Sequence, residues 1–115
     1  MCRLAPDAPV PEWATLASIF SVMRTRDELS IVVPQEDVPK SVVCQRDFRA
    51  LQVVGPLEFD QVGVLASLAT PLADAGISIF AISTYDTDYI LVRQADLSRA
   101  IEALRAAGHT VGEER

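Results

Sequence analysis

The chain has 115 residues, the size of one domain or of two very small modules, which excludes a multi-domain enzyme. Hydrophobic residues make up 50% of it and charged residues 23%, a balance typical of a folded protein with a buried core. Sixteen acidic residues against 10 basic ones give a formal net charge of −6. The attraction to phosphate that drives most binding to nucleic acids and anionic membranes is therefore missing.

Signals for metals, cofactors and membranes are weak. Cys2 and Cys44 form no CxxC motif and His109 is the single histidine, so we expect no metal, no cofactor, and two reduced, inert thiols. Residues 1–13 contain three prolines and two acids, unlike a secretory signal. The most apolar window, 62–75, is shorter than the roughly 20 residues that cross a bilayer. We expect a cytoplasmic protein that binds neither membranes nor nucleic acids.

The N-terminal part, residues 1–47, is predicted to be irregular. Prolines at positions 6, 9, 11, 34 and 39 remove backbone hydrogen-bond donors and break helical runs. They leave room for only a short helical turn around residues 12–15. Two β-rich runs, 19–23 and 29–33, predict a hairpin.

Two amphipathic helices are predicted after that hairpin, over residues 62–75 and 97–107. Apolar residues recur at steps of three and four on one face of each run. Gly76 and Gly108 follow the two runs and supply the left-handed residue with which many helices end. Acidic residues stand at the expected N-cap positions: Asp60 and Asp96.

Strands are predicted around these helices, in runs rich in Val, Ile, Tyr and Phe. Their ranges are 49–54, 77–83, 88–92 and 109–112. The order over residues 48–115 is then β-α-β-β-α-β, the α+β, ferredoxin-like arrangement in which both helices cover one face of an antiparallel sheet. We expect residues 1–47 to form a degenerate half that packs against this complete C-terminal domain.

An internal repeat links the two parts. Residues 20–38 align without a gap to residues 79–97, at an offset of 59. Identical residues then coincide at several positions, among them Thr25 with Thr84 and Gln35 with Gln94. Either the chain contains a duplication, or two hairpins followed by polar turns share these letters by chance.

The first candidate for ligand binding is the stretch 58–69, where a strand passes through a polar loop into a helix. Free N–H groups and the positive end of the helix dipole face that loop, and Gly63 leaves the backbone open to a ligand. Such a place suits a carboxylate. The alternative is that Gly63 only permits close packing of the helix on the sheet.

The second candidate is the turn over residues 83–89. Turn chemistry alone explains Asp86 and Thr87, whose side chains bond to nearby backbone. Asp88 begins an apolar strand and points to recognition of an ammonium group, and the hydroxyls of Thr84 and Tyr85 lie beside it in sequence. A carboxylate on one side and a helix start on the other would select a zwitterion. No catalytic triad, GxSxG motif or phosphate loop is present, so we expect no enzymatic activity.

The segment FDQVGVLASLATPLADAGISIFAISTYDTDYILV resembles the ACT domain, a small ligand-binding regulatory module of amino-acid metabolism. It is most similar to the branch of the bacterial tandem-ACT proteins and the CASTOR arginine sensors, in its run GISIFAISTYDTDYILV. A weaker resemblance covers PEWATLASIFSVMRTRDELSIVVP. Two ACT-like units are implied.

The resemblance implies that a free amino acid binds between two ACT units. The positions that match the family's ligand contacts are Glu58, Gln61, Gly63, Val64, Ser78, Ile79, Thr84, Tyr85 and Asp88. Asp88 matches the ammonium partner, and Ser78 and Ile79 match positions that reach the ligand from the opposing unit. Gln61 replaces the acidic residue that meets a cationic side chain in the sensors, which favours a neutral or smaller amino acid over arginine.

The resemblance also bears on assembly. Family members carry an extra strand ahead of residues 1–11, so we expect the sheet edge near residues 41–44 to need cover from a partner chain. We therefore expect a homodimer that acts on a separate regulated protein. The alternative is an ACT module for protein–protein interaction or structure, without a ligand.

Overall fold

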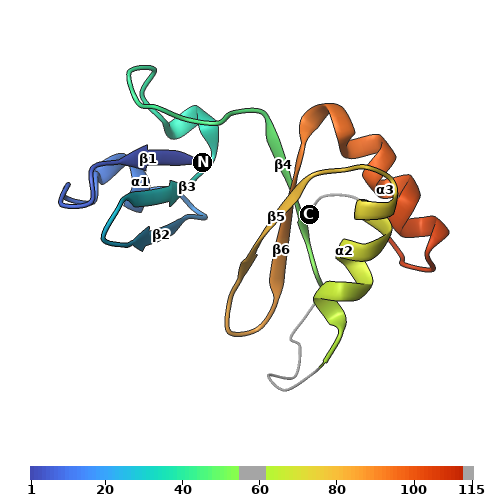
Figure 1. Cartoon of the computed structure of the whole chain (residues 1–115). Helices are drawn as coiled ribbons and strands as arrows, with labels where there is room; N and C mark the ends of the chain where they lie inside the picture. The colour runs from blue at the N-terminus through green and yellow to red at the C-terminus, as the bar shows by residue number, and fades with distance from the viewer. Residues whose placement is uncertain (55–61, 113–115) are drawn as a thin grey trace. The chain divides into compact units, whose positions relative to one another are not determined.

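The computed structural model describes residues 1–54 and 62–112, and the chain forms two compact units, Met1–Asp47 and Phe48–Arg115 (Figure 1). Each unit has its own three-stranded antiparallel sheet and its own hydrophobic core, so the predicted α+β class is confirmed. No helix in the described ranges is long and apolar enough to cross a bilayer.

The N-terminal unit is built around the predicted hairpin. Its elements are β1 (Cys2–Leu4), α1 (Glu12–Thr15), β2 (Ser21–Arg24), β3 (Leu29–Val32) and a 3-10 turn, η1 (Gln35–Asp37). The strand order is β1-β3-β2. Cys2, Ala14, Leu29 and Ile31 form its core and are at most 2% exposed. The short helical turn and the hairpin are thus confirmed, whereas β1 was not predicted.

The segment near residues 41–44, for which the sequence predicts cover from a partner chain, pairs on one side with the protein's own β1. The Arg3 N–H donates to the Val43 carbonyl at 3.1 Å, and the Gln45 N–H donates to the Met1 carbonyl at 2.8 Å. Cys2 and Cys44 are antiparallel bridge partners between these bonds. β1 therefore covers one side of this segment, and a partner chain on the other side stays a prediction.

The C-terminal unit carries two helices on one face of its sheet (Figure 1). Its elements are β4 (Phe48–Gln52), α2 (Val64–Asp74), β5 (Ile79–Ser83), β6 (Asp88–Arg93), the 3-10 turn η2 (Gln94–Asp96) and α3 (Leu97–Ala106). The strand order is β4-β6-β5, with both pairings antiparallel. The core consists of Leu72, Ile77, Ile90, Val92, Ala100 and Leu104. It lies between the sheet and the apolar stripes of the helices.

Three predictions about this unit were wrong in detail. Residues 109–112 form no strand. Among the described strands, β4 therefore pairs only with β6 and lies at an edge of the sheet. The first helix begins at Val64, which leaves Val62 93% exposed instead of on the buried stripe. The Asp96 carboxylate caps no helix N–H but pairs with Arg99 at 2.9 Å. The predicted N-cap Asp60 lies outside the described residues.

The repeat is present in the hydrogen bonds of the structure. In one hairpin Val22 pairs with Ile31, and in the other Ala81 pairs with Ile90, both displaced by 59 positions. The turns match too, because the Thr25 N–H donates to Glu28 and the Thr84 N–H to Thr87, each at 2.8 Å. The 3-10 turns η1 and η2 follow at the same displacement. The repeat in the sequence thus extends to the register, the turn and the 3-10 helix that follows, which favours the duplication.

Pro71 lies inside α2 and has no N–H to donate to the carbonyl of Ser67, four residues earlier. The His109 ring replaces the missing donor. Its Nε2 lies 2.9 Å from the Ser67 oxygen, and since a carbonyl only accepts, the ring nitrogen donates. The segment after α3 is thereby attached to the middle of α2.

We predict that His109→Ala lowers the free energy of unfolding by about 1 kcal/mol, because the Ser67 carbonyl loses its donor. Pro71→Ala restores a backbone N–H at that carbonyl and stabilises the chain. In the Pro71→Ala background, His109→Ala should cost clearly less. Urea denaturation of the four proteins followed by circular dichroism measures this coupling. If His109→Ala lowers the free energy of unfolding equally in both backgrounds, the His109 ring does not replace the N–H that Pro71 lacks.

Candidate functional site

The candidate site lies at the end of the C-terminal sheet where β5 turns into β6. Thr84 organises this turn, because its Oγ1 donates to the Thr87 carbonyl and accepts the Thr87 N–H, both at 3.1 Å. Tyr85 extends from the turn with 82% of its surface exposed. The Thr84 hydroxyl is thus committed to the turn, and its predicted role as a ligand hydroxyl competes with these two bonds.

Asp88 is the first residue of β6 and is half-buried. Its cross-strand neighbour is Ser83, whose Oγ donates to the Asp88 Oδ1 at 2.6 Å. Within residues 1–54 and 62–112, no arginine or lysine bonds to this carboxylate. A neutral hydroxyl therefore orients the negative charge without neutralising it, which is what recognition of an ammonium group requires. Sequence reasoning missed Ser83, which the hairpin register alone identifies.

The same turn holds the end of β4. Thr87 is 8% exposed, and its Oγ1 donates to the Val53 carbonyl at 2.5 Å. The Val53 N–H donates to the Asp88 carbonyl at 2.9 Å. The strand that leads toward residues 55–61 is therefore attached to the turn that carries Asp88.

Gly63 precedes α2 with a left-handed backbone, φ +85°. A Cβ built at this position meets no atom within 4 Å, so close packing of the helix on the sheet does not explain the glycine. The positive φ explains it, because L side chains rarely adopt that conformation. Close packing, one of the two alternatives from the sequence, is therefore not the reason for this glycine, and ligand binding at the open backbone stays a prediction.

The start of α2 carries backbone N–H groups that no side chain of residues 1–54 or 62–112 caps. The Ser67 N–H makes the first intrahelical bond, to Gly63 at 2.9 Å, so the three preceding N–H groups point out of the helix end. Neither a side-chain cap nor an acidic residue in the first turn meets them in the described part of the chain. These N–H groups and the helix dipole can bind a carboxylate.

The predicted site residues divide into three groups. Thr84, Tyr85 and Asp88 share one end of the sheet with the start of α2, where Gly63 and Val64 lie (Figure 1). Ser78 and Ile79 lie at the opposite end of β5, about 14 Å along the strand. The Ile79 side chain packs on the unit's own core. Glu58 and Gln61 lie outside the described residues.

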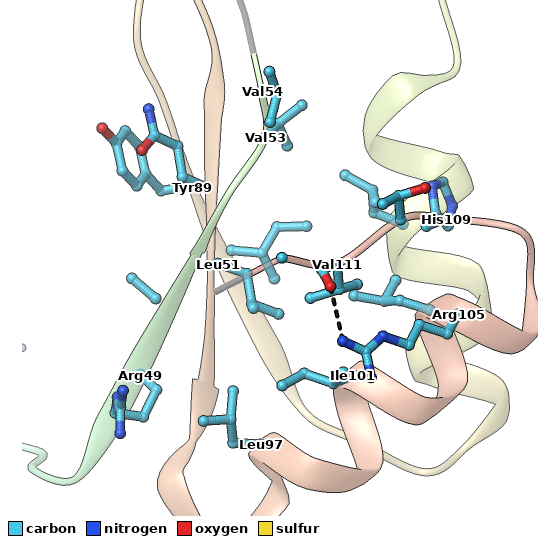
Figure 2. Close-up of a pocket in the computed structure, with 17 residues that line it drawn as sticks. Arg49, Leu51, Val53, Val54, Tyr89, Leu97, Ile101, Arg105, His109 and Val111 are labelled. Atoms are coloured by element: carbon cyan, nitrogen blue, oxygen red, sulfur yellow. Dashed lines mark hydrogen bonds between the residues drawn. The ribbon is translucent and has the colours of Figure 1, made fainter. Parts of the chain in front are cut away.

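A cavity of about 760 Å³ lies elsewhere in this unit, between β4, α3 and residues 109–112 (Figure 2). Leu51, Leu97, Ile101 and Val111 project into it. Arg105 is already engaged, since its Nη2 donates to the Val111 carbonyl at 2.8 Å. No predicted site residue lines this cavity. Polar residues such as Arg49, Gln52 and Thr110 line it together with the apolar ones, and it marks where the core opens beside the edge of β4.

The sequence model described as ACT domain matches residues 43–106, more than half of the chain. The chain belongs to the ACT domain family. A second model, described as an N-terminal domain, matches residues 1–41.

Two relatives place this ACT protein in the CASTOR-like branch. Human CASTOR3P is 36% identical over 96 residues, which are 72% of this chain and 59% of that protein. Subunit 1 of the cytosolic arginine sensor for mTORC1 from Bos taurus is 41% identical over 59 residues, which are 50% of this chain and 18% of that one. The chain thus spans less than two thirds of either relative.

Solved structures agree with this fold. Protein Atu0741 from Agobacterium tumefaciens superposes with a TM-score of 0.92 at 37% identity, over 99% of this chain and 85% of that one. VC0802 from Vibrio cholerae, a protein of unknown function, superposes with a TM-score of 0.75 at 26% identity, over 94% and 81% of the two chains.

We predict that Thr87→Val lowers the free energy of unfolding by about 1–2 kcal/mol, because a buried hydroxyl bond to Val53 is lost with little change in volume. Thr110→Val, at an exposed position, is the matched control and should be nearly neutral. Urea denaturation of both variants tests this. Equal effects of the two substitutions would show that the bond does not hold β4 to the turn.

Proposed function

We propose that this ACT protein is a non-enzymatic regulatory module that binds a free amino acid and acts on a separate protein in the cytosol. The observation that carries the proposal is the half-buried Asp88 carboxylate, oriented by Ser83 and bonded to no cation in the described chain. A carboxylate held in this way suits the ammonium group of an amino acid.

The opposite end of the ligand is proposed to meet the start of α2. The N–H groups after Gly63, which no described side chain caps, suit its carboxylate, and they lie at the same end of the sheet as Asp88 (Figure 1). A ligand that carries both charges a few ångströms apart gains from both contacts. Glu58, Gln61, Val64, Thr84 and Tyr85 complete this side of the proposed site.

A second copy of the chain would supply the remaining residues. In an antiparallel pair, the backbone N–H and C=O groups of alternate residues point to opposite sides of the strand. The Thr84–Thr87 bond shows that those of Ile79, Ala81 and Ser83 point away from β6, to the edge of β5 where no described strand lies. Two β5 edges paired around Ala81 would bring Ile79 of one copy beside Ser83 of the other. Ser78 and Ile79 would then reach the Asp88 end of the site, as a homodimer requires.

The ligand class follows from the charges. One relative is named as a cytosolic arginine sensor, which makes arginine the first amino acid to test. Gln61 provides no negative charge for a cationic side chain, so we favour a neutral amino acid. The alternative function is an ACT module for protein–protein interaction that binds no ligand.

We predict that one of the twenty common amino acids raises the melting temperature of the protein, and that Asp88→Asn weakens its binding about 10- to 100-fold. The loss of the anionic partner for the ammonium group is the reason. Asp86→Asn removes the same charge from an exposed position in the same turn and should leave affinity unchanged. Thermal shift and isothermal titration calorimetry measure both effects. If no amino acid stabilises the protein, the interaction module becomes the better proposal.

We also predict that Gly63→Ala reduces amino-acid affinity at least about tenfold, whereas Gly76→Ala does not. Both glycines have a positive φ, +85° and +75°, and a Cβ at either meets no atom within 4 Å. Both substitutions therefore carry a similar backbone strain, about 1–2 kcal/mol. Only Gly63 lies at the helix start proposed to hold the carboxylate. Equal loss of affinity in the two variants would attribute the effect to strain alone.

A further inference from the structure

The two cysteines form a cross-strand pair in the N-terminal unit. The Met1 amino group donates to the Gln45 carbonyl at 3.0 Å, and the Gln45 N–H donates to the Met1 carbonyl at 2.8 Å. On the other side, Arg3 bonds to Val43. Cys2 and Cys44 are therefore the non-hydrogen-bonded pair between these bonds, whose side chains share one face of the sheet. The Cα atoms of such pairs are about 4.5 Å apart, within the range that disulfides span.

The thiols themselves are in contact. The two Sγ atoms lie 2.6 Å apart, and either thiol can donate to the other. Cys2 is 2% exposed, whereas Cys44 is partly exposed. Both line a hollow of about 200 Å³, together with Arg3, Val43 and other residues of the two segments. The pair therefore opens to solvent through this hollow, and Cys44 is the more exposed of the two cysteines.

We propose that Cys2 and Cys44 are a dithiol modification site, which a low-molecular-weight disulfide such as glutathione disulfide converts to an intramolecular disulfide. The Cys44 thiolate attacks one sulfur of the reagent, and the first glutathione leaves as a thiolate. The Cys2 sulfur then attacks the Cys44 sulfur of this mixed disulfide and displaces the second glutathione. The two protein thiols lose two electrons and two protons, and two molecules of glutathione carry them away.

The difference in burial between the two cysteines decides which of them reacts first with the reagent. Burial, with smaller contributions from the hydrogen bond and charge of Cys44, raises the pKa of the Cys2 thiol to about 11. Cys2 is therefore a poor first nucleophile, and the more exposed Cys44 reacts first. Once Cys44 is in a mixed disulfide, its hydrogen bond and charge no longer oppose ionisation of Cys2. Arg46 continues to favour the Cys2 thiolate.

The bridge would join β1 covalently to the segment that covers its outer edge. Because the cysteines are 42 positions apart, it closes almost the whole N-terminal unit into one loop. Loops of this length lose much conformational freedom in the unfolded state when they are cross-linked. The oxidised unit should therefore unfold at a higher temperature.

The test is incubation of the full chain in glutathione buffers of increasing oxidation, followed by alkylation of free thiols in denaturant and intact mass measurement. The chain has two cysteines, so the assignment is unambiguous. We expect a monomer that takes up no alkyl group, has lost two hydrogen atoms and yields a linked peptide pair containing Cys2 and Cys44. Two alkyl groups at every buffer composition, or links only between chains, would overturn the proposal.

Variants test the geometry and the roles. Cys2→Ser should stop at a glutathione adduct on Cys44, and Cys44→Ser should leave Cys2 unmodified in the folded protein. Moving the second cysteine by one position, in Cys44→Ser/Val43→Cys, turns it to the other face of the strand and should prevent the bridge. A bridge that forms as readily in this control would refute the cross-strand pairing. Trp13 packs on the core of this unit, so its fluorescence reports the expected rise in unfolding temperature.

Discussion

The C-terminal site depends on one buried contact, between the hydroxyl of Thr87 and the carbonyl of Val53. It is made where the hairpin turns, and it joins the turn to the strand that runs beside it. Because Thr87 and Asp88 are adjacent, the bond fixes the backbone on which the carboxylate is carried. The chain then enters α2 from this same end of the sheet (Figure 1). Fold and candidate site are therefore positioned by the same interaction.

Local sequence patterns predicted the secondary-structure elements whose contacts lie between residues close in sequence. The helices and both hairpins were predicted because apolar spacing and turn chemistry act within a few positions. β1 was missed because it has three residues, one of them Arg3, and its partners lie 25 to 29 positions away. The strand expected over residues 109–112 failed for the opposite reason. Its composition suits a strand, but strand formation needs a register with β4 that composition does not encode.

The same distinction applies to single residues of the site. Asp88 and Gly63 were chosen from their places relative to a turn and a helix start, and the structure puts both at one end of the sheet. Ser83 was missed because a cross-strand neighbour is known only once the register is known. The sequence could likewise show that Pro71 leaves a carbonyl without its donor, but not that His109 supplies one from the segment after α3.

The two units differ in length in the connection between their first and second strands. Cys2 and Leu51 hold equivalent positions in the outer strands and are 49 residues apart, whereas their partners Ile31 and Ile90 are 59 apart. The difference of ten falls in the first connection, where α1 has 4 residues and α2 has 11. Closing a longer connection costs little entropy, while a shift within a hairpin would move every side chain to the wrong face. If the two halves descend from one ancestral gene, insertions and deletions were tolerated in the connection between the first two strands and were selected against in the hairpin.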